Sequence, residues 1–483
     1  MENYDLDLAS IQEVRNLVCA AKTAQQKFST CSSQEIDKAV EGLSKIAFEN
    51  AEYLAKMACE ETGFGIWQDK MQKNILSSQK LWTFMKDMRT VGIIDEFPEK
   101  KIIQIATPMG VIAGLIPSTN PTSTVIYKAL IALKSGNSIV FSPHPSAAKC
   151  ILETVKILRK GCVIYGIPED LIGCISIPTI EASGALMKHK DVAMILATGG
   201  AEMVKAAYSS GTPALGVGPG NVPAFIERTA DIEDAVEKIF LSKGFDNGTV
   251  CASEQAIVTE RCIENQVRDA VIRQGGYFLK GEDLEKVKGI MEKSNGSMNP
   301  NIVGKPAQFI ANLAEISIPE HVKLLVGEEP GIGPQHPFSK EKLTQLIGFY
   351  VVSDWNEACE TCFKLLKNGG LGHTLSIHSN NEEVIREFAM KKPVSRFLVN
   401  TPSTHGAVGL STGLAPSMTL GCGTIGGSAT SDNVTPLHLI NSRWVAYGLD
   451  PVLPSKAVEA EIEVDKICQL VLEELNKVYK INI

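Results

Sequence analysis

Short apolar runs alternate with helical segments from residue 102 onward, and this alternation constrains the fold more than any other feature of the sequence. Residues 111–116, 138–141 and 192–197 have the length and apolar character of buried strands. Strands that alternate with helices are joined by right-handed crossovers and pair in parallel. The pattern therefore predicts a parallel sheet in an α/β, nucleotide-binding architecture.

A second alternation of the same kind runs from residue 224 to about residue 400, with expected strands at 256–258, 324–326 and 397–399. At 483 residues the chain exceeds the size at which a single core keeps growing, so two or more domains are expected. Before the first strand, residues 9–62 carry apolar positions at helical spacing and predict two or three amphipathic helices outside a sheet.

Two further segments lie outside these alternations. Residues 90–95 and 101–105 flank a short polar turn and predict a hairpin. Near the C-terminus, prolines and the acidic residues 459–463 precede a final amphipathic helix. A helix of roughly 16 residues is marginal alone in water, so we expect it to pack on the body or on a partner.

Composition excludes several classes of function. The net charge of −8 leaves no basic surface for nucleic acid, and no apolar run approaches the length of a membrane span. The first twenty residues are acidic rather than basic and apolar, so we expect a cytoplasmic protein without a secretory signal. Its 12 cysteines are then expected to be reduced thiols.

Cys359 and Cys362 form the one close cysteine pair. Residues spaced i and i+3 share one face of a helix, and no second pair stands at zinc spacing. We therefore expect helix packing here and no metal site.

Cys251 follows the flexible turn Asn247-Gly248 and precedes the polar residues 253–255. A cysteine is more often a small buried apolar residue than a nucleophile. A nucleophilic thiol needs access to substrate and a setting that favours the thiolate, and a turn of this kind provides the access. Cys251 is therefore a candidate nucleophile if its neighbours support that role.

The neighbours resemble the active-site segment of the aldehyde dehydrogenase superfamily. Four more segments, at 107–121, 139–145, 197–201 and 216–221, match superfamily landmarks in the right order. The resemblance implies an aldehyde dehydrogenase-like fold: two αβα domains with parallel-type sheets plus a β-hairpin oligomerisation arm. It also implies a homodimer or homotetramer.

The same resemblance suggests domain boundaries. The dinucleotide-binding domain would comprise residues 1–90 and 108–221, and the catalytic domain residues 222–424. Residues 91–107 and 425–452 would form the oligomerisation arm, and residues 453–483 a linker and an amphipathic C-terminal helix.

One departure from the superfamily narrows the function. Hydrolytic members carry a glutamate at the head of their Leu-Gly-Gly-Lys motif, and the matching segment here begins at Gly216 with no carboxylate. Together with His373 and the segment 395–400, this departure resembles the coenzyme A-acylating aldehyde dehydrogenases. A thioester that is not hydrolysed can be passed to another thiol.

The resemblance implies a role for three residues. Cys251 would attack the aldehyde, the Asn120 amide and the Cys251 backbone N–H would hold the oxyanion, and His373 would assist proton movement during thiol exchange. Structural roles for Asn120, as a turn residue before Pro121, and for His373 remain open alternatives. The carboxylate of Glu254 is left without a role.

The resemblance also implies NAD as the cofactor, with NADP as an alternative, and coenzyme A as co-substrate. Small residues before the helix that begins at Ala201 would let a phosphate approach its N-terminus. Glu341 would hold the nicotinamide ribose, although a solvated surface charge is an equal alternative. The expected cofactor-binding residues are Ser142, His144, Pro145, Thr198, Gly199, Gly200, Gly218 and Glu341.

These features predict an oxidoreductase that converts acetaldehyde or propanal to acyl-coenzyme A reversibly through a Cys251 thioester. Alternatives are an acylating succinate-semialdehyde dehydrogenase, a non-redox cysteine acyltransferase or hydrolase, and a non-catalytic assembly component. Residues 464–475 resemble the encapsulation peptides of bacterial microcompartment enzymes, which implies a shell protein as a partner of residues 459–483. Docking of this helix within the oligomer is the alternative.

Overall fold

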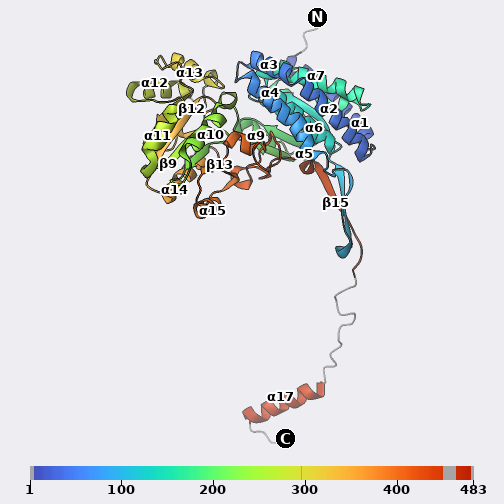
Figure 1. The fold of residues 1–483 in the computed structure, drawn as a ribbon. Coiled ribbons are helices and arrows are strands. Elements are labelled where there is room, and N and C mark those ends of the chain that lie inside the picture. The colour runs from blue at the N-terminus through green and yellow to red at the C-terminus, as the bar shows by residue number, and fades with distance from the viewer. Residues whose placement is uncertain (1–4, 295, 450–463, 480–483) are drawn as a thin grey trace.

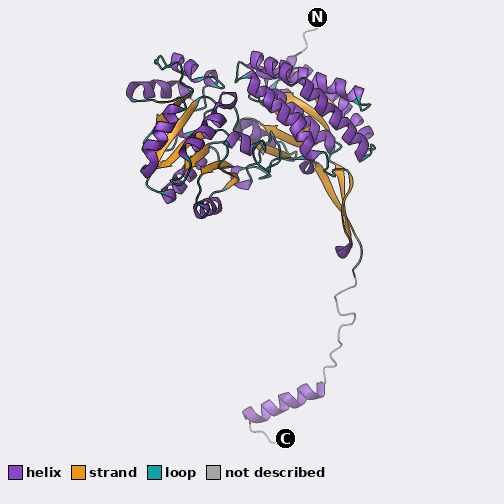
Figure 2. Cartoon of the chain, in the orientation of Figure 1, coloured by secondary structure: helices purple, strands orange, loops and turns teal. Residues whose placement is uncertain are grey.

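The computed structural model describes residues 5–294, 296–449 and 464–479. Its strands form a five-stranded, a seven-stranded and a three-stranded sheet. Figure 1 shows two helix-covered lobes, one built mainly from the blue and cyan N-terminal half and one from the green to orange remainder, with a narrow arm projecting from the first. The same view by secondary structure shows helices packed around both large sheets (Figure 2).

The first lobe is built on the five-stranded parallel sheet, ordered β5-β4-β3-β6-β7. Side chains alternate between its faces: Val111, Ala113 and Leu115 pack towards α1 and α8, whereas Ile112 and Ile116 pack towards α2, α6 and α7. The strands are β3 (Val111–Ile116), β4 (Ser138–Pro143), β5 (Ile172–Cys174), β6 (Val192–Thr198) and β7 (Ala214–Val217); the helices are α1 (Leu6–Phe28), α2 (Ser33–Glu49), α3 (Ala51–Thr62), α4 (Trp67–Ile75), α5 (Leu81–Met85), α6 (Pro121–Lys134), α7 (Ala148–Ile164), α8 (Ile180–Met187) and α9 (Ala201–Tyr208).

The second lobe is built on the seven-stranded sheet, ordered β10-β11-β12-β9-β8-β13-β14 and parallel throughout. Helices α10 and α11 cover one face and α14 and α15 the other. The strands are β8 (Val222–Ile226), β9 (Glu254–Glu260), β10 (Gly276–Phe278), β11 (Leu324–Glu328), β12 (Leu346–Val352), β13 (Gly372–His378) and β14 (Val394–Val399); the helices are α10 (Ile232–Gly244), α11 (Glu264–Arg273), α12 (Gly281–Met291), α13 (Ala307–Leu313), α14 (Trp355–Lys367), α15 (Glu382–Lys391) and α16 (Ser403–Ala407).

The arm is the three-stranded antiparallel sheet of β1 (Gly92–Phe97), β2 (Ile102–Pro108) and β15 (Ile440–Ala446). The expected hairpin is present as β1 and β2, and the C-terminal strand β15 pairs with β2 along its whole length. Trp444 and Val445 of β15 are exposed apolar residues. The arm therefore offers an uncovered apolar surface away from the lobes.

The last helix, α17 (Val464–Tyr479), confirms the expected C-terminal helix, and each of its residues is exposed. Residues 453–463 and 480–483 of the expected linker and tail lie outside the described residues. In the part of the chain that the structure describes, no helix combines the length and the apolar character that a membrane crossing needs.

The predicted fold class is confirmed. The first predicted strand coincides with β3, and the other five predicted strands each lie within an observed one. Three helices, α1 to α3, fill the N-terminal segment where two or three were expected. The three sheets lie within the residue ranges expected for the two domains and the arm, except that β2 extends one residue beyond the arm to Pro108, and those domain boundaries remain a prediction.

Candidate active site

Cys251 lies on a tight connection between α10 and β9. The chain leaves α10 through a short 3₁₀ turn at Phe245–Gly248, in which Asp246 and Asn247 both have a φ of 51° and Gly248 a φ of 76°. Few residues tolerate left-handed backbone, and Asn, Asp and Gly are those that do so most readily. This sequence therefore permits the turn that brings the half-buried Cys251 to a pocket between the lobes.

His373 is the closest titratable side chain to the nucleophile. Its Nε2 atom lies 3.3 Å from Cys251 Sγ, and its Nδ1 atom lies 2.8 Å from Thr374 Oγ1. Arg396 of β14 donates from Nε to Thr374 Oγ1 at 3.2 Å and from a terminal nitrogen to the His373 carbonyl at 2.9 Å. His373 is thus oriented from two sides and can accept the thiol proton.

The electrostatics of this pair favour neutral groups in the free protein. Burial, with smaller contributions from Glu341 and Cys422 and against the opposing effect of Arg396, raises the pKa of Cys251 to about 12. Burial, aided by Arg396, holds the pKa of His373 well below its ordinary value. A neutral imidazole beside a thiol can take up a proton as the sulfur attacks, so His373 has the protonation state of a general base.

Asn120 stands at the N-cap position of α6, but its side chain does not cap that helix. Its Nδ2 atom donates to Thr119 Oγ1 at 3.1 Å and reaches Thr249 O only at 3.5 Å. Asn120 also lines the same pocket as Cys251. One N–H of the Asn120 amide therefore makes only a long hydrogen bond, to the carbonyl of Thr249 near Cys251. An oxyanion donor needs such an N–H group that is available to the substrate.

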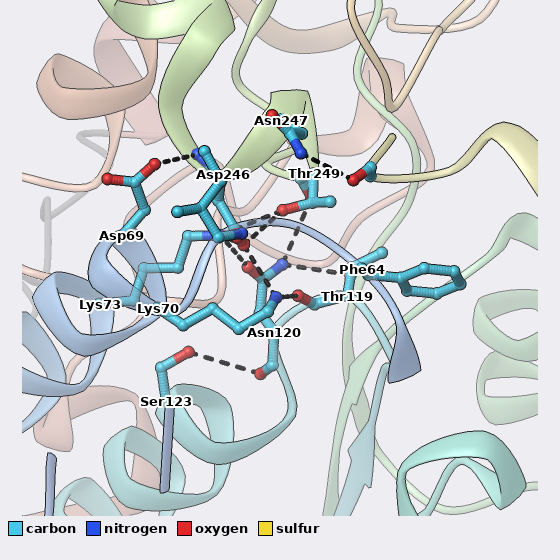
Figure 3. Close-up of polar contacts among 12 residues, drawn as sticks. Phe64, Asp69, Lys70, Lys73, Thr119, Asn120, Ser123, Asp246, Asn247 and Thr249 are labelled. Atoms are coloured by element: carbon cyan, nitrogen blue, oxygen red, sulfur yellow. Dashed lines mark hydrogen bonds and ion pairs between the residues drawn. The ribbon is translucent and has the colours of Figure 1, made fainter. Parts of the chain in front are cut away.

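A buried ionic cluster lies behind Asn120 (Figure 3). We call it the Asp246 cluster, comprising Lys70, Lys73, Asp246 and Thr249. Lys73 Nζ donates to Asn120 Oδ1 at 2.7 Å, to Thr249 Oγ1 at 3.2 Å and to Asp246 Oδ2. Lys70 Nζ donates to the same Asp246 oxygen at 2.9 Å and to Thr119 O at 2.9 Å. Helix α4 of the first lobe thereby holds the nucleophile turn of the second.

The carboxylate of this cluster keeps its charge near neutral pH. Burial alone would raise the pKa of Asp246, but Lys70 and Lys73 outweigh it and hold that pKa below its ordinary value. Burial lowers the pKa of Lys73 to about 8 against the opposing effect of Asp246. Lys73 is therefore mainly an ammonium at pH 7.

A second buried cluster follows Cys251 in the chain. We call it the Gln255 cluster, comprising Lys243, Glu254, Gln255, Glu341 and Lys342. Lys243 Nζ donates to Gln255 Oε1 at 3.1 Å and to Lys342 O at 2.7 Å. Glu254 Oε1 accepts the Ser403 N–H at 2.9 Å, while its Oε2 atom is buried without a hydrogen-bond partner.

Burial dominates the titration of the Gln255 cluster. It raises the pKa of Glu254 and of Glu341 to about 7 each and lowers the pKa of Lys243 to about 7. Among the described residues, no ion pair joins these lysines to these carboxylates. Glu254, which sequence reasoning left without a role, lies outside the pocket lining.

The pocket beside Cys251 has a volume of about 220 Å³ and accommodates much of the expected cofactor site. His144, Thr198, Gly199, Gly200, Gly218 and Glu341 line it together with Asn120 and Cys251. Glu341 Oε1 accepts the Gly220 N–H at 2.9 Å, so its carboxylate is held in the pocket wall. No side chain caps α9 after Gly200, and an added Cβ there would meet open space, so the residues present fit a phosphate at this helix start.

Two predicted cofactor residues do not belong to this wall. Ser142 is buried and its hydroxyl pairs with Ser183 Oγ at 2.8 Å. Pro145 begins a short turn after β4 and is absent from the pocket lining. Their roles in binding adenosine remain predictions.

The assignment of Gly216 as the position of the missing glutamate remains a prediction. A Cβ at Gly216 would point into α9, at 2.7 Å from Val204 and 2.8 Å from Tyr208, whereas Val217 lines the same pocket as Cys251. Side chains alternate along strand β7, so these two residues project to opposite sides of the strand. Neither residue carries a carboxylate.

The Cys359–Cys362 pair lies on α14 as predicted, and both side chains are buried among apolar residues of the second lobe. Sequence reasoning missed Lys70, Lys73 and Thr249, which lie close to the nucleophile. A signal for them exists: lysines at i and i+3 put two cations on one face of α4. It did not reveal the partner, because Asp246 is far away in sequence.

Comparisons with known proteins agree with this geometry. The model of the aldehyde dehydrogenase family matches residues 4–338. The chain is 43% identical over 451 residues to the bifunctional aldehyde-alcohol dehydrogenase of Escherichia coli (strain K12), covering 92% of this chain and 50% of that enzyme. It thus spans about half the length of the first curated relatives it matches. It is also 38% identical over 435 residues to the succinate-semialdehyde dehydrogenase (acetylating) of Clostridium kluyveri, covering 90% of this chain and 95% of that enzyme.

Solved structures extend the likeness. An acetylating aldehyde dehydrogenase from Geobacillus thermoglucosidasius superposes with a TM-score of 0.92 at 51% identity, covering 94% of this chain and 100% of the other. The propionaldehyde dehydrogenase of Rhodopseudomonas palustris with bound propionyl-CoA superposes with a TM-score of 0.83 at 28% identity, covering 90% of this chain and 94% of the other. The propionaldehyde dehydrogenase of the Clostridium phytofermentans fucose utilisation bacterial microcompartment also superposes with a TM-score of 0.83, at 27% identity, covering 92% of this chain and 99% of the other. With a cysteine and an amide lining one pocket between two parallel sheets and an imidazole in contact with that cysteine, the chain belongs to the aldehyde dehydrogenase family, beside its acylating members.

Proposed function

We propose that this chain catalyses the NAD-linked, coenzyme A-acylating oxidation of a short aldehyde, acetaldehyde or propanal, through a thioester on Cys251. The observation that carries the proposal is the contact of Cys251 with His373 beside a pocket wall in which the segment Gly216–Val217 carries no carboxylate to support hydrolysis. Without a base to activate water there, a second thiol is the better acceptor of the acyl group.

The residues support a balanced sequence of steps. His373 accepts the Sγ proton as Cys251 attacks the carbonyl carbon, and a C–S bond forms while the carbonyl oxygen becomes an oxyanion held by Asn120. The bound dinucleotide supplies the acceptor for the hydride that leaves this carbon. His373 then releases this first proton to solvent. The thiol of coenzyme A attacks the thioester, its proton passes to the neutral His373, and Cys251 leaves as a thiolate that His373 reprotonates. Aldehyde, NAD⁺ and coenzyme A thus give acyl-coenzyme A, NADH and one proton.

A direct test measures NADH formation with the purified protein, an aldehyde and NAD, with and without coenzyme A, followed by chromatography of the products. We expect acyl-coenzyme A as the main product and its reduction to aldehyde in the reverse assay. Cys251→Ala should abolish turnover, whereas Cys362→Ala serves as the matched cysteine control. Free acid formed at the same rate without coenzyme A would contradict the acylating assignment.

The same assay resolves the remaining choices. A panel of acetaldehyde, propanal, butanal and succinate semialdehyde tests the substrate, because the relative from Clostridium kluyveri is named for succinate semialdehyde. NADP in place of NAD tests the dinucleotide, since one solved neighbour, an engineered glycolyl-CoA reductase, has bound NADP⁺. Acyl transfer or hydrolysis without any dinucleotide would favour the non-redox alternative.

We also propose that the arm joins subunits into a homodimer or homotetramer and that residues 459–483 bind a microcompartment shell protein in the cytoplasm. The exposed apolar residues of β15 and of α17 support these roles. Deletion of residues 459–483 should leave activity and oligomeric state unchanged and remove co-purification with shell proteins. Dissociation of the shortened enzyme, with a tail that ignores shells, would instead make the helix structural.

A further inference from the structure

Lys73 is buried behind the pocket and contacts two of the residues that line it. Its own side chain is absent from the pocket lining, but its Nζ atom donates to Asn120 Oδ1 and to Thr249 Oγ1. Lys73 and Asn120 are far in sequence from the turn that precedes Cys251, and Figure 3 shows both beside Thr249 of that segment. The contact of Lys73 with Asn120 therefore determines what the amide can present to the substrate.

The hydrogen bonds of Lys73 match an ammonium group. An ammonium has three N–H donors and no acceptor. Lys73 Nζ has three oxygen partners: Asn120 Oδ1, Thr249 Oγ1 and Asp246 Oδ2. The hydroxyl of Thr249 donates to Asp246 Oδ2 at 2.7 Å, so its oxygen is left to accept from Lys73. Each donor of the ammonium thus has one acceptor.

This arrangement fixes the orientation of the Asn120 amide. Rotated by half a turn, the amide would place its NH₂ group against the N–H donors of Lys73, with no acceptor between them. With Oδ1 on Lys73, the Nδ2 atom must face Thr119, Thr249 and the pocket. A cation on the carbonyl oxygen also polarises the amide and strengthens its N–H donors.

We propose that Lys73 is a positioning residue of the oxyanion site: its ammonium group locks the Asn120 amide with Nδ2 towards the nucleophile and strengthens that donor when negative charge develops. The inference rests on the proposed aldehyde chemistry at Cys251. Loss of an oxyanion donor costs about 10²- to 10³-fold in rate, and loss of its orientation costs part of that, about 10- to 30-fold.

Lys70 provides a matched control. It lies one turn away on α4, is equally buried, and donates to the same Asp246 oxygen, but it contacts the Thr119 carbonyl and not the Asn120 side chain. Each of the substitutions Lys70→Met and Lys73→Met therefore removes one of the two cations that contact the Asp246 carboxylate. A purely structural role for Lys73 predicts equal effects of the two substitutions.

The test measures how well acetaldehyde protects Cys251 from alkylation by iodoacetamide in the absence of dinucleotide and coenzyme A. For each variant, the alkylation rate with acetaldehyde is divided by the rate of the same variant without acetaldehyde. We expect Lys73→Met to raise the half-protecting acetaldehyde concentration about tenfold and Lys70→Met to raise it less than about threefold. In an Asn120→Ala background, Lys73→Met should add less than about twofold, because the amide through which it acts is gone.

Single-turnover NAD reduction gives a second readout, in which Lys73→Met should slow the rate at saturating aldehyde by the same factor. If Lys73→Met does not fold, Lys73→Gln replaces it. A glutamine amide can still donate to Asn120 Oδ1, so its loss of rate and of aldehyde protection should be smaller than that expected for Lys73→Met. Equal shifts for the two lysine variants, or full additivity with Asn120→Ala, would overturn the inference while leaving the proposed function intact. Absence of aldehyde protection in the wild type would overturn the proposed function and the inference with it.

Discussion

The Asp246 cluster and the Gln255 cluster are both buried beside Cys251, but they hold their charges differently. In the first, two lysines contact one carboxylate directly, and the pKa of Asp246 stays below its ordinary value. In the second, the pKa values of Glu254, Glu341 and Lys243 are all brought to about 7. Burial shifts carboxyl groups without a direct cationic partner towards the neutral form, whereas contact with two lysines keeps Asp246 ionised. The carboxylate on one side of the nucleophile therefore keeps its charge, and the carboxyl groups on the other side change their protonation near neutral pH.

The largest expected effect comes from breaking the paired cluster. Asp246→Asn leaves two buried ammonium groups without a carboxylate, and we expect a loss of about 3–5 kcal/mol in unfolding free energy. Denaturant unfolding near pH 7 measures it. The control is Asp191→Asn, which removes the carboxylate of the surface pair with Lys22 and should cost about 0–1 kcal/mol. Equal losses at both positions would show that burial of the cluster has no special effect.

A smaller effect is expected from the unpaired cluster, and it depends on pH. The pKa of Glu254 is about 7 in the folded protein and near 4.5 when unfolded, so the folded state binds the proton more tightly. The resulting stability is complete below about pH 4.5 and is lost as pH rises through 7. Glu254→Gln removes this loss, so its stability relative to wild type should rise by about 1–3 kcal/mol between pH 5 and 7.5.

Glu387→Gln is the control for that experiment, because Glu387 is an exposed partner of Lys391. Its stability relative to wild type should stay nearly constant over the same range. A flat profile for Glu254→Gln as well would mean that Glu254 is ionised throughout, and the contrast between the clusters would disappear.

Glu341 links the unpaired cluster to the nucleophile. Its carboxylate raises the pKa of Cys251, so Glu341→Gln should lower that pKa and speed alkylation of Cys251 by iodoacetamide about two- to fivefold at pH 8.5. Because the pKa of Glu341 is about 7, the difference should vanish below about pH 6, where the wild-type group is protonated. A difference that is independent of pH would point to steric access instead of charge.

The smallest effect is expected at a buried site without charge. Cys362 lies on the buried face of α14 in the apolar core, and Cys362→Ala should cost about 1 kcal/mol or less and change turnover less than about twofold. Activity and unfolding measurements check this. Loss of activity together with loss of a bound metal would revive a metal role for the Cys359–Cys362 pair.

Much of the fold was predictable because buried parallel strands are short apolar runs, and six of them were located from the sequence. Cys251 and Asn120 were predicted because the motif around each residue, and the spacing between the two, can be read directly from the sequence. The Asp246 cluster was not predicted, since lysine is usually exposed and the contact from Lys73 spans 173 residues. Gly216 and Val217 show a different limit: a motif identifies the segment, but the alternation of side chains along the strand decides which one lines the pocket.

The contacts of α4 with the turn after α10 also bear on how the chain folds. They join residues 173 and 176 positions apart, and contacts of such long range form late because the intervening chain must be ordered first. The strands and helices of each lobe can form and be protected from hydrogen exchange before Lys73 meets Asp246. On refolding, the helical signal should therefore return before acetaldehyde can protect Cys251 from alkylation. A nascent or partly unfolded chain would carry a Cys251 thiol that is not yet positioned for catalysis.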